Sequence, residues 1–126
     1  MKLAAVLAKG VASDATAVPA LEAIRMATLN GAKALGIESK IGSVVAGKEA
    51  DLIAVNLSEI ESLPIYSVVS HVVFATTRDQ VTDVWVAGKQ LLKSRQLTTI
   101  NETEVQEQAK AWQAKVSAVD PESPVE

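Results

Sequence analysis

Few residues of this sequence have the types and spacing that catalysis needs. His71 is the single histidine, and the chain contains no cysteine. A catalytic zinc ion needs three protein ligands, usually histidine or carboxylate, and an open position for water. One histidine meets this need only if carboxylates converge on it, and the spacing does not predict that they do. We therefore expect His71 to be structural, with a place near a pocket of a larger protein or a metal-ligand role as the alternatives.

Acidic and hydroxyl side chains that could serve as bases or nucleophiles lack partners in the sequence. No base lies beside Ser13-Asp14 or beside Asp79 and Asp83, and no serine stands in a G-x-S-x-G motif. Asp51 precedes an apolar run, and we expect it to accept hydrogen bonds from backbone N–H groups of the preceding turn. The sequence therefore assigns no catalytic, cofactor-binding or metal-binding residue, and the lack of cysteine excludes disulfides and thiolate nucleophiles.

The segment from Gly42 to Lys48 has the glycine and lysine spacing of a phosphate-binding loop. That motif, G-x-x-x-x-G-K-(S/T), needs serine or threonine after the lysine and lies between a strand and a helix. Here Glu49 follows Lys48 and a strand is predicted next, so no helix N-terminus would face a phosphate. We interpret the segment as turns that punctuate two short strands.

The elements that must position these residues begin with helices. Segments with good helix formers and apolar residues on one face are residues 2–9, the stretch that ends at 28, 29–35, 65–75 and 101–118. We expect Gly10 to end the first helix and Asp14 or Thr16 to cap the second. Thr28 is the expected N-cap of the third helix, and Gly36 stops it. The valines of 65–75 also fit a strand, but we favour a short helix there.

Strands are predicted between the third helix and the last one. They are expected over Ser43–Val45 and Asp51–Asn56, the second of them buried on both faces because its apolar residues do not alternate with polar ones. The clearest hairpin spans Gln80–Leu92 across Ala87-Gly88. Alanine is poor at the first position of a tight hairpin turn, so a longer or irregular turn is expected. Arg95–Thr98 is expected to extend the outgoing strand.

The last helix has the clearest amphipathic pattern. Asn101 and Glu104 have the spacing of a capping box at its start. Its apolar stripe consists of Val105, Ala109, Trp112 and Val116. We expect Trp112 on this stripe and Trp85 on the hairpin to pack in the core, and a helix-on-sheet contact between the two is a testable hypothesis.

Composition limits the class of protein. The 126 residues, 48% hydrophobic and 21% charged, suit one domain with a core. A net charge of -3 without a basic run argues against a nucleic-acid partner. The apolar stretch from Leu3 to Ala8 is too short for a signal peptide, and no run approaches the roughly 20 residues of a membrane span. We expect a cytoplasmic protein without a membrane partner.

Residues 41–57, IGSVVAGKEADLIAVNL, follow the pattern G-x-(I/V)-x-x-G-K-x-A-D-L-x-x-x-(D/N). This pattern resembles a segment near the C-terminus of the metal-dependent amidohydrolase superfamily. Residues 1–36 and 64–92 are similar to the same superfamily in the same order. The resemblance covers Met1 to about Ala118, and the most similar subgroup is the chlorohydrolase-like deaminases that act on 5-methylthioadenosine and S-adenosylhomocysteine.

The resemblance implies an α+β fold that is incomplete. Residues 1–38 would be the terminal helices of a (β/α)8 barrel, 39–100 part of a composite β-sandwich, 101–118 a C-terminal amphipathic helix and 119–126 a flexible tail. The other strands of the sandwich would come from the N-terminal part of a longer parent. Met1 matches an internal methionine of the family pattern, which predicts a truncation or a misplaced start.

The superfamily binds one divalent metal, usually zinc or iron, and the resemblance places every ligand before Met1. Hydrolytic deamination at a purine C6 needs an activated water, so we expect this chain to be inactive alone. Metal and small-molecule substrate would belong to the full-length parent. Apolar faces and strand edges would be exposed and could drive homo-oligomer formation. The alternatives are a stand-alone interaction or dimerisation module derived from that scaffold, and an unrelated α+β protein.

Overall fold

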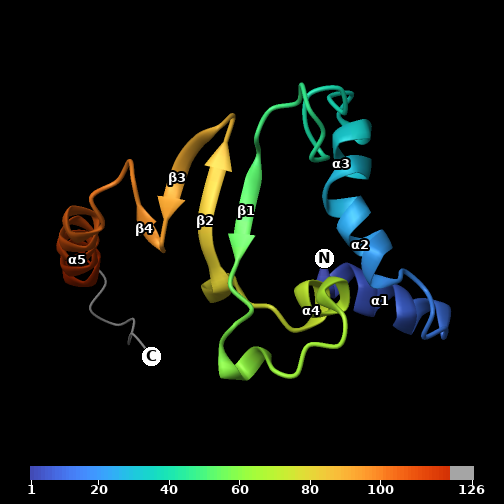
Figure 1. The fold of residues 1–126 in the computed structure, drawn as a ribbon. Helices are drawn as coiled ribbons and strands as arrows, with labels where there is room; N and C mark the ends of the chain where they lie inside the picture. The colour runs from blue at the N-terminus through green and yellow to red at the C-terminus, as the bar shows by residue number, and fades with distance from the viewer. Residues whose placement is uncertain (120–126) are drawn as a thin grey trace.

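The computed structural model describes residues 1–119 of the chain. A four-stranded antiparallel sheet stands between helices α1 to α4 on one side and helix α5 on the other (Figure 1). The α-helices are α1 Lys2–Ala12, α2 Ala20–Ala27, α3 Leu29–Ala34, α4 Val68–Phe74 and α5 Glu102–Val119. The strands are β1 Leu52–Val55, β2 Val81–Val86, β3 Lys89–Lys93 and β4 Gln96–Leu97, and the 3-10 helices are η1 Ile60–Ser62 and η2 Arg78–Gln80.

Small side chains bring helices α1, α2 and α4 together. Ala5, Ala23 and Val73, one from each helix, are almost completely buried and form one cluster. Ser67 begins α4, because its hydroxyl accepts a hydrogen bond from the Ser70 N–H at 3.3 Å. The short helix expected within residues 65–75 is therefore confirmed.

Two helix ends differ from the prediction. Helix α1 does not end at Gly10 but continues to Ala12, where Ser13 in the left-handed conformation (φ 51°) closes it. Helix α2 begins after Pro19, and neither Asp14 nor Thr16 caps it. Instead the Asp14 carboxylate accepts hydrogen bonds from the N–H and the hydroxyl of Thr16, each at 2.7 Å. The polar residues expected to cap α2 thus form a turn of their own.

Helix α3 lies where the sequence predicts it, but its N-cap works differently. Thr28 occupies the N-cap position, yet its hydroxyl donates back to the Ile24 carbonyl at 2.7 Å and makes no side-chain cap. Gly36, with φ +70°, follows the helix in the left-handed conformation as expected of a stop signal.

The sheet has the order β1-β2-β3-β4, and all its neighbours are antiparallel. The strand expected over Asp51–Asn56 and the hairpin over Gln80–Leu92 are confirmed. Ser43–Val45 is not a strand, because the chain turns there: the Val45 N–H bonds to the Ser43 carbonyl at 3.1 Å. Burial of β1 on both faces is also wrong for this chain, since Ile53 is 61% exposed at the edge of the sheet.

The hairpin has a tight two-residue turn, so the expectation of a longer or irregular turn is wrong. Val86 pairs with Lys89, and the two turn residues, Ala87 and Gly88, have φ of 48° and 76°. Both positive values are those of a type I′ turn. The chain reverses again at Ser94-Arg95, so residues 96–97 form a separate strand paired with β3 and do not extend it.

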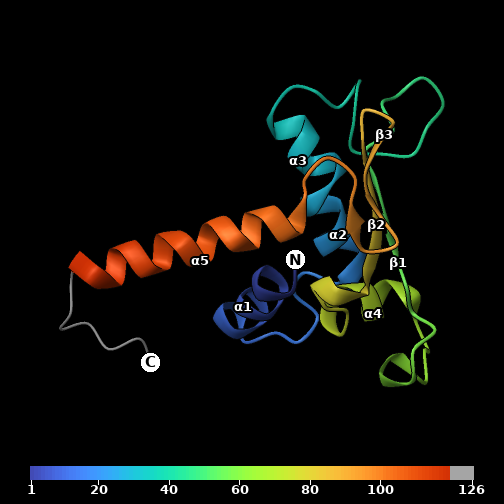
Figure 2. The same ribbon diagram turned by 90° about the vertical axis from the view of Figure 1, so that its left-hand side faces the viewer.

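Helix α5 extends away from the rest of the molecule (Figure 2). Asn101 caps its first turn by accepting a hydrogen bond from the Glu104 N–H at 3.3 Å. Trp112 is 65% exposed, so the expectation that it packs in the core is wrong for the described chain. Val119 is the last residue of the helix and not part of a tail, while residues 120–126 of the expected tail lie outside the described residues.

Candidate functional site

His71 and Asp79 line the same hollow of about 490 Å³, and most of its lining residues are polar. Helix α4 supplies His71, η2 supplies Asp79, and η1 with the residue before it supplies two glutamates. The lining residues are Asn56, Glu59, Glu61, Ser62, His71, Ala75, Thr77, Asp79, Gln80, Thr82 and Arg95. Its ionisable side chains make this hollow the first candidate for a functional site.

A buried hydrogen-bond network forms the floor of this hollow. The Gln80 amide donates to the Ser62 hydroxyl at 2.6 Å and to the Asn56 carbonyl at 3.3 Å, and its oxygen accepts from the Thr77 N–H at 2.9 Å. Ser62 is 2% exposed and Gln80 9%. The sequence interpretation missed both residues, although the spacing of Thr77 and Gln80 is that of a capping box. All these groups bond to one another, so the floor is structural.

Arg95 is the arginine that lines the hollow, and its guanidinium donates hydrogen bonds to backbone carbonyl groups. One guanidinium nitrogen, Nη1, donates to the carbonyls of Arg78, Asp79 and Val81 at 3.3, 2.7 and 3.1 Å. Its Nη2 lies 3.8 Å from the Asp79 carboxylate, an exposed ion pair of little energetic weight. Arg95 thus ties the β3–β4 turn to the end of η2.

The donors around His71 do not fit a catalytic metal. Within residues 1–119, histidine and carboxylate side chains nowhere gather in a group of three or more that could hold an ion. A catalytic zinc needs three such ligands. The residues that line this hollow therefore do not fit a zinc or iron ion.

Asp83 lies on β2 and holds a turn of the sheet. Hydrogen bonds from the Thr82 hydroxyl, the Ser94 N–H and the Gln90 amide, together with the nearby Lys93 ammonium, lower the pKa of the Asp83 carboxyl. Two of these bonds measure 3.1 Å from the Ser94 N–H and 2.9 Å from the Gln90 amide. The structure does not bring Asp83 and Asp79 together as an acid–base pair, because Asp83 does not line the hollow that contains Asp79.

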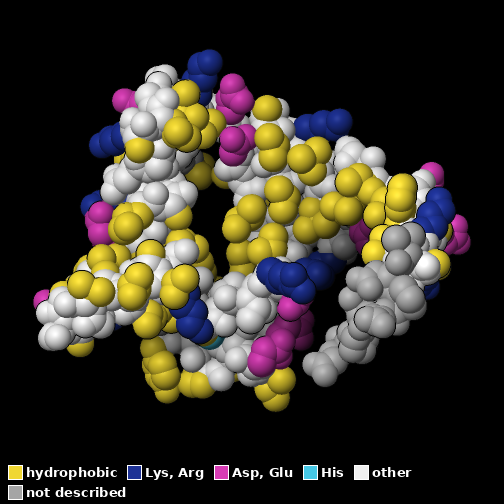
Figure 3. Space-filling view, turned by 180° about the vertical axis from the view of Figure 1, so that it is seen from behind, with side chains coloured by type: hydrophobic (Ala, Val, Ile, Leu, Met, Phe, Trp, Pro, Cys, Tyr) yellow, Lys and Arg dark blue, Asp and Glu magenta, His cyan; other side chains and the backbone are white. Residues whose placement is uncertain are grey.

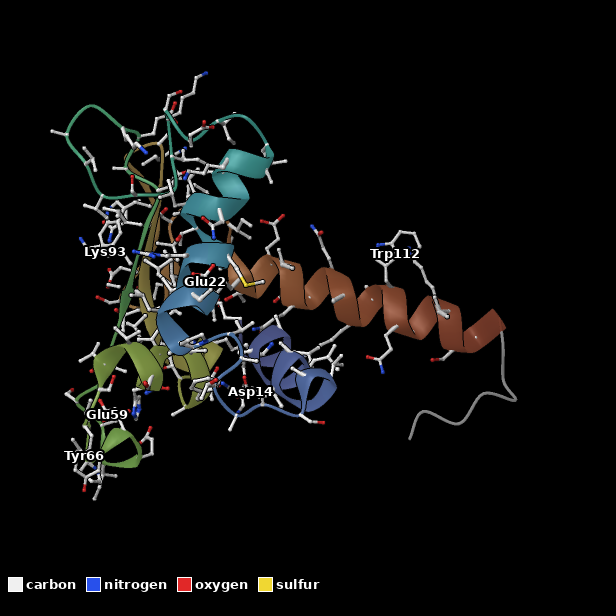
Figure 4. The ribbon with its side chains drawn as sticks, turned by 90° about the vertical axis from the view of Figure 1, so that its right-hand side faces the viewer. Asp14, Glu22, Glu59, Tyr66, Lys93 and Trp112 are labelled. Atoms are coloured by element: carbon white, nitrogen blue, oxygen red, sulfur yellow. The ribbon has the colours of Figure 1, made fainter. Side chains whose placement is uncertain are left out.

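Asp14 is also a turn residue, in the loop between α1 and α2 (Figure 4). The hydroxyl and N–H of Thr16, with the charge of Lys9, lower the pKa of the Asp14 carboxyl. The Lys9 ammonium donates to the carbonyls of Ala15 and Ala17 at 2.6 and 2.7 Å. The contacts of Asp14 and Lys9 therefore stabilise the α1–α2 loop.

A second hollow, of about 660 Å³, lies between the end of α2 and the chain that leads into β1. Its lining is mostly apolar and comprises Ala27, Thr28, residues 41–46 and residues 48–52. The Lys48 ammonium donates to the Glu38 carbonyl, to the Ile41 carbonyl at 3.2 Å and to the Ser43 hydroxyl at 2.7 Å. Because this ammonium is already bonded to its own loop, the segment from Gly42 to Lys48 is a self-contained turn, and the phosphate-loop interpretation stays rejected.

Asp51 accepts a backbone hydrogen bond, but from a different turn than expected. Its carboxylate accepts from the Ala87 N–H at 2.7 Å, at the β2–β3 turn, and the Gly88 N–H bonds to the Ala50 carbonyl at 3.1 Å. The expectation that Asp51 bonds to the turn before it is therefore wrong. These bonds also stabilise the tight conformation that places Ala87 at positive φ.

The comparison with protein families identifies the class. Residues 1–91 match the model of the amidohydrolase family, so this chain belongs to that family. No helix of residues 1–119 is both long and apolar enough for a membrane crossing.

Relatives in this family carry the names of deaminases. The chain is 44% identical over 118 residues to the 5-methylthioadenosine/S-adenosylhomocysteine deaminase of Teredinibacter turnerae and 42% identical over 118 residues to that of Saccharophagus degradans. The match covers 94% of this chain but 27% and 26% of the two enzymes. The chain therefore spans about a quarter of the length of the relatives it matches.

Solved structures agree with this placement. An adenosine deaminase from Xanthomonas campestris with bound zinc matches with a TM-score of 0.86 and 44% identity, over 93% of this chain and 27% of the enzyme. The atrazine chlorohydrolase of Arthrobacter aurescens, complexed with zinc, matches with a TM-score of 0.68 over 75% of this chain and 21% of the enzyme. Its identity of 21% supports the fold alone.

Proposed function

We propose that this chain is the C-terminal segment of a metal-dependent deaminase that hydrolyses the C6–amino bond of a purine nucleoside-type substrate. The match of 118 residues at 44% identity to an enzyme named as such a deaminase carries the proposal. In that parent a zinc or iron ion, held by residues outside this segment, would supply the activated water. The segment itself would have a structural role in the enzyme.

The proposed architecture divides the segment into scaffold parts. Residues 1–38 would close the barrel, 39–100 would complete a β-sandwich and 101–118 would pack outside it. The sparse core supports this division, because only Ala5, Ala23, Ala32 and Val73 are buried apolar residues among those described. A chain that is 48% hydrophobic and buries so few apolar side chains has surfaces that suit cover by further protein.

A chimeric enzyme tests the proposal. The matched segment of the Teredinibacter turnerae deaminase is replaced by residues of this chain, and ammonia release from 5-methylthioadenosine is measured with zinc present. We expect turnover by the chimera and none by the 126-residue chain alone, because the described part of the chain lacks a metal-ligand set. Turnover by the isolated chain, or a folded but inactive chimera, contradicts the proposal.

The parent would act in the cytoplasm on a small molecule, without nucleic-acid or membrane partners. The net charge of -3 and the absence of cysteine support this placement. A homo-oligomer formed through exposed apolar surface is also part of the proposal. Fractionation of cells that express the parent checks the compartment.

A second candidate function is a stand-alone module that self-associates. The open edge of β1 favours it, because Leu52 is 38% and Ile53 61% exposed on a strand with one described neighbour. Size-exclusion chromatography with light scattering tests it: a discrete dimer with a cooperative melt supports this function. If the chain is instead a segment of a larger deaminase, we expect polydisperse association and a broad melt.

A further inference from the structure

Helix α5 carries an apolar stripe that is exposed in the described molecule. Val105, Trp112 and Val116 are 50%, 65% and 63% exposed, and Ala109 lies between them on the same face. The helix extends away from the other elements (Figure 2), and Trp112 lies on its free part (Figure 4). No other helix or strand of residues 1–119 packs along it. A row of large apolar side chains on such a helix is typical of a surface that binds protein.

This stripe is separate from the other apolar surface of the molecule. Hydrophobic side chains also line the gap between the helices and the sheet (Figure 3). That gap lies beside β1, whereas α5 follows β4 at the opposite edge of the sheet (Figure 1). The side chains of α5 themselves therefore have to indicate what binds the stripe.

The stripe is complementary to a second copy of itself that runs in the opposite direction. Its residues follow one another at intervals of four, three and four positions, a pattern that is the same in both directions. In an antiparallel pair, Val105 of one copy faces Val116 of the other, and Ala109 faces Trp112. Each indole then meets the smallest side chain of the stripe, so the two helices can pack closely. Such a self-complementary surface is typical of homodimers with two-fold symmetry.

The charges of α5 favour the same orientation. Its acidic residues precede its basic ones along the helix: Glu102, Glu104 and Glu107 come first, and Lys110 and Lys115 follow. A parallel pair would bring like charges together, whereas an antiparallel pair brings the acidic end of each copy beside the basic end of the other. The dipoles of the two helices are also opposed in the antiparallel pair, which is the favourable arrangement.

Glu104 and Lys115 lie along one flank of the stripe. The Lys115 ammonium is 4.8 Å from the centroid of the Trp112 ring, which places it beside the stripe. The Glu104 carboxylate accepts a hydrogen bond from the Gln108 amide at 3.3 Å, and Lys115 follows Gln108 by about two helical turns on the same side. Antiparallel helices place equivalent flanks next to each other, so Glu104 of each copy comes within reach of Lys115 of the other.

We propose that two copies of this chain associate through the α5 stripes as an antiparallel helix pair, with an ion pair between Glu104 and Lys115 on each side of the two-fold axis. The inference rests on the proposed function and deepens it, because it assigns the proposed homo-oligomer to one helix face and one orientation. A pair of 18-residue helices forms a small interface, so the dimer is reversible and dissociates on dilution.

Disulfide trapping tests the orientation, because the chain has no cysteine of its own. Val105→Cys and Val116→Cys are made as separate variants of the 126-residue chain and oxidised singly and as a mixture. We expect about tenfold more cross-linked dimer from the mixture than from either variant alone, since only the mixture brings two cysteines face to face. Equal cross-linking of the single variants and the mixture, or none in any sample, overturns the inference.

Charge exchange tests the ion pairs in the chimeric enzyme, where the parent provides cover for the other apolar surfaces. Glu104→Lys and Lys115→Glu should each weaken dimerisation about tenfold in sedimentation equilibrium, because like charges replace both ion pairs. A mixture of the two variants should form a heterodimer of nearly the original affinity, since opposite charges meet again. The matched controls, Glu107→Lys and Lys110→Glu, make the same changes on the face away from the stripe and should leave the affinity unchanged.

Equal effects at the flank and on the control face, or no recovery in the mixture, overturn the antiparallel pair. An active chimera that is monomeric at all concentrations overturns this inference alone, and the proposed function stands. A folded but inactive chimera overturns the proposed function instead, and the disulfide experiment on the 126-residue chain then still decides whether α5 pairs with a second copy.

Discussion

The helical part and the sheet of this chain are held together by different interactions. Helices α1, α2 and α4 meet through buried small side chains, with Ala5 and Ala23 at 0% and 2% exposure. The strands contain no residue among the buried apolar ones, and polar contacts define their turns: Asp51 at the β2–β3 turn, Asp83 at the β3–β4 turn and Arg95 at the end of η2. The helices thus have a small core of their own, whereas the sheet has fixed turns and no core.

This difference shows that side-chain contacts at the turns can fix the register of the strands even when the faces of the sheet are not buried. Side-chain hydrogen bonds to backbone fix where each strand reverses, and register follows from the turn. Burial of the faces, which supplies most of the free energy of a sheet, must then come from elsewhere. The predictions below test the two parts separately.

The largest effect is expected at the junction of the two parts. Gly42 has φ +88°, and a Cβ there would lie 2.8 Å from the Ala32 Cβ and 3.0 Å from the Leu29 Cα. Gly42→Ala should lower the free energy of unfolding by about 3 kcal/mol, from left-handed strain and overpacking together. Urea unfolding followed by circular dichroism measures it.

The control for this variant is Gly10→Ala. Gly10 lies inside α1, and nothing is within 4 Å of an added Cβ. This change should raise the stability by about 0.5–1 kcal/mol, because alanine loses less backbone entropy in a helix. A loss of stability at Gly10, or no loss at Gly42, would show that the junction is not packed as described.

The next effect concerns the polar network of Gln80 in the floor of the hollow. Gln80→Leu leaves the Ser62 hydroxyl and the Thr77 N–H without their partner. We expect a loss of about 1–3 kcal/mol from these unsatisfied buried groups. Urea unfolding again measures it, with Gln113→Leu on the exposed face of α5 as control. Equal effects of the two changes would mean that the network does not stabilise the sheet.

Acid should weaken the sheet through Asp83. Because the folded-state pKa of this carboxyl is lowered, the folded state binds fewer protons than the unfolded state in the acid range. Its contribution is present above the unfolded pKa and is lost as the pH falls through the folded value, from about pH 5 downward. The effect is small, since the side chain is exposed to solvent.

The measurement is the thermal midpoint of the chain between pH 7 and pH 3. We expect Asp83→Asn to flatten this profile, because asparagine does not titrate. Asp14→Asn, whose carboxyl also has a lowered pKa in the α1–α2 loop, provides the same test for the helical part. A wild-type profile no steeper than that of both variants would argue that neither turn contributes to pH dependence.

The smallest effect is expected on α5. Trp112 is 65% exposed, and its described partner is the Lys115 ammonium at 4.8 Å from the ring centroid. Trp112→Ala should change the stability of the isolated chain by less than about 0.5 kcal/mol. In the chimeric enzyme, where proposed neighbours are present, a larger loss is expected. Thermal melts of both proteins make the comparison, and equal small changes would place α5 outside the packed enzyme.

Local signals in the sequence were sufficient for most elements and insufficient for their packing. The apolar run at 52–55, the hairpin and the Asn101 cap lie where residue patterns predicted them. The end of α1 was predicted too early at Gly10, because glycine is compatible with a helix interior. The turn at Ala87 was predicted wrongly, because its N–H donates to the Asp51 carboxylate, which lies 36 residues away in the sequence. The burial of Trp112 was predicted wrongly, because an amphipathic stripe indicates that one face of a helix is buried but does not identify the segment that covers this face.

The surroundings of the candidate site residues depend on contacts that the sequence pattern does not indicate. No pattern in the sequence indicated that His71 would share a hollow with Asp79 or that Arg95 would bind backbone carbonyls there. Such contacts depend on how α4, η2 and the β3–β4 turn are arranged in space, which spacing along the chain does not encode. The capping-box spacing of Thr77 and Gln80 was the one local signal available for that region.

The bond from Asp51 to the Ala87 N–H joins residues separated by 36 positions, whereas the β2–β3 hairpin closes over two turn residues. Chain closure over long separations is slow because its entropic cost precedes any stabilising contact. We therefore expect the hairpin to exist before β1 reaches it during folding. The last strand to join the sheet would then be the one whose outer side is unpaired within residues 1–119, so this side becomes an edge of the sheet only after the hairpin has formed.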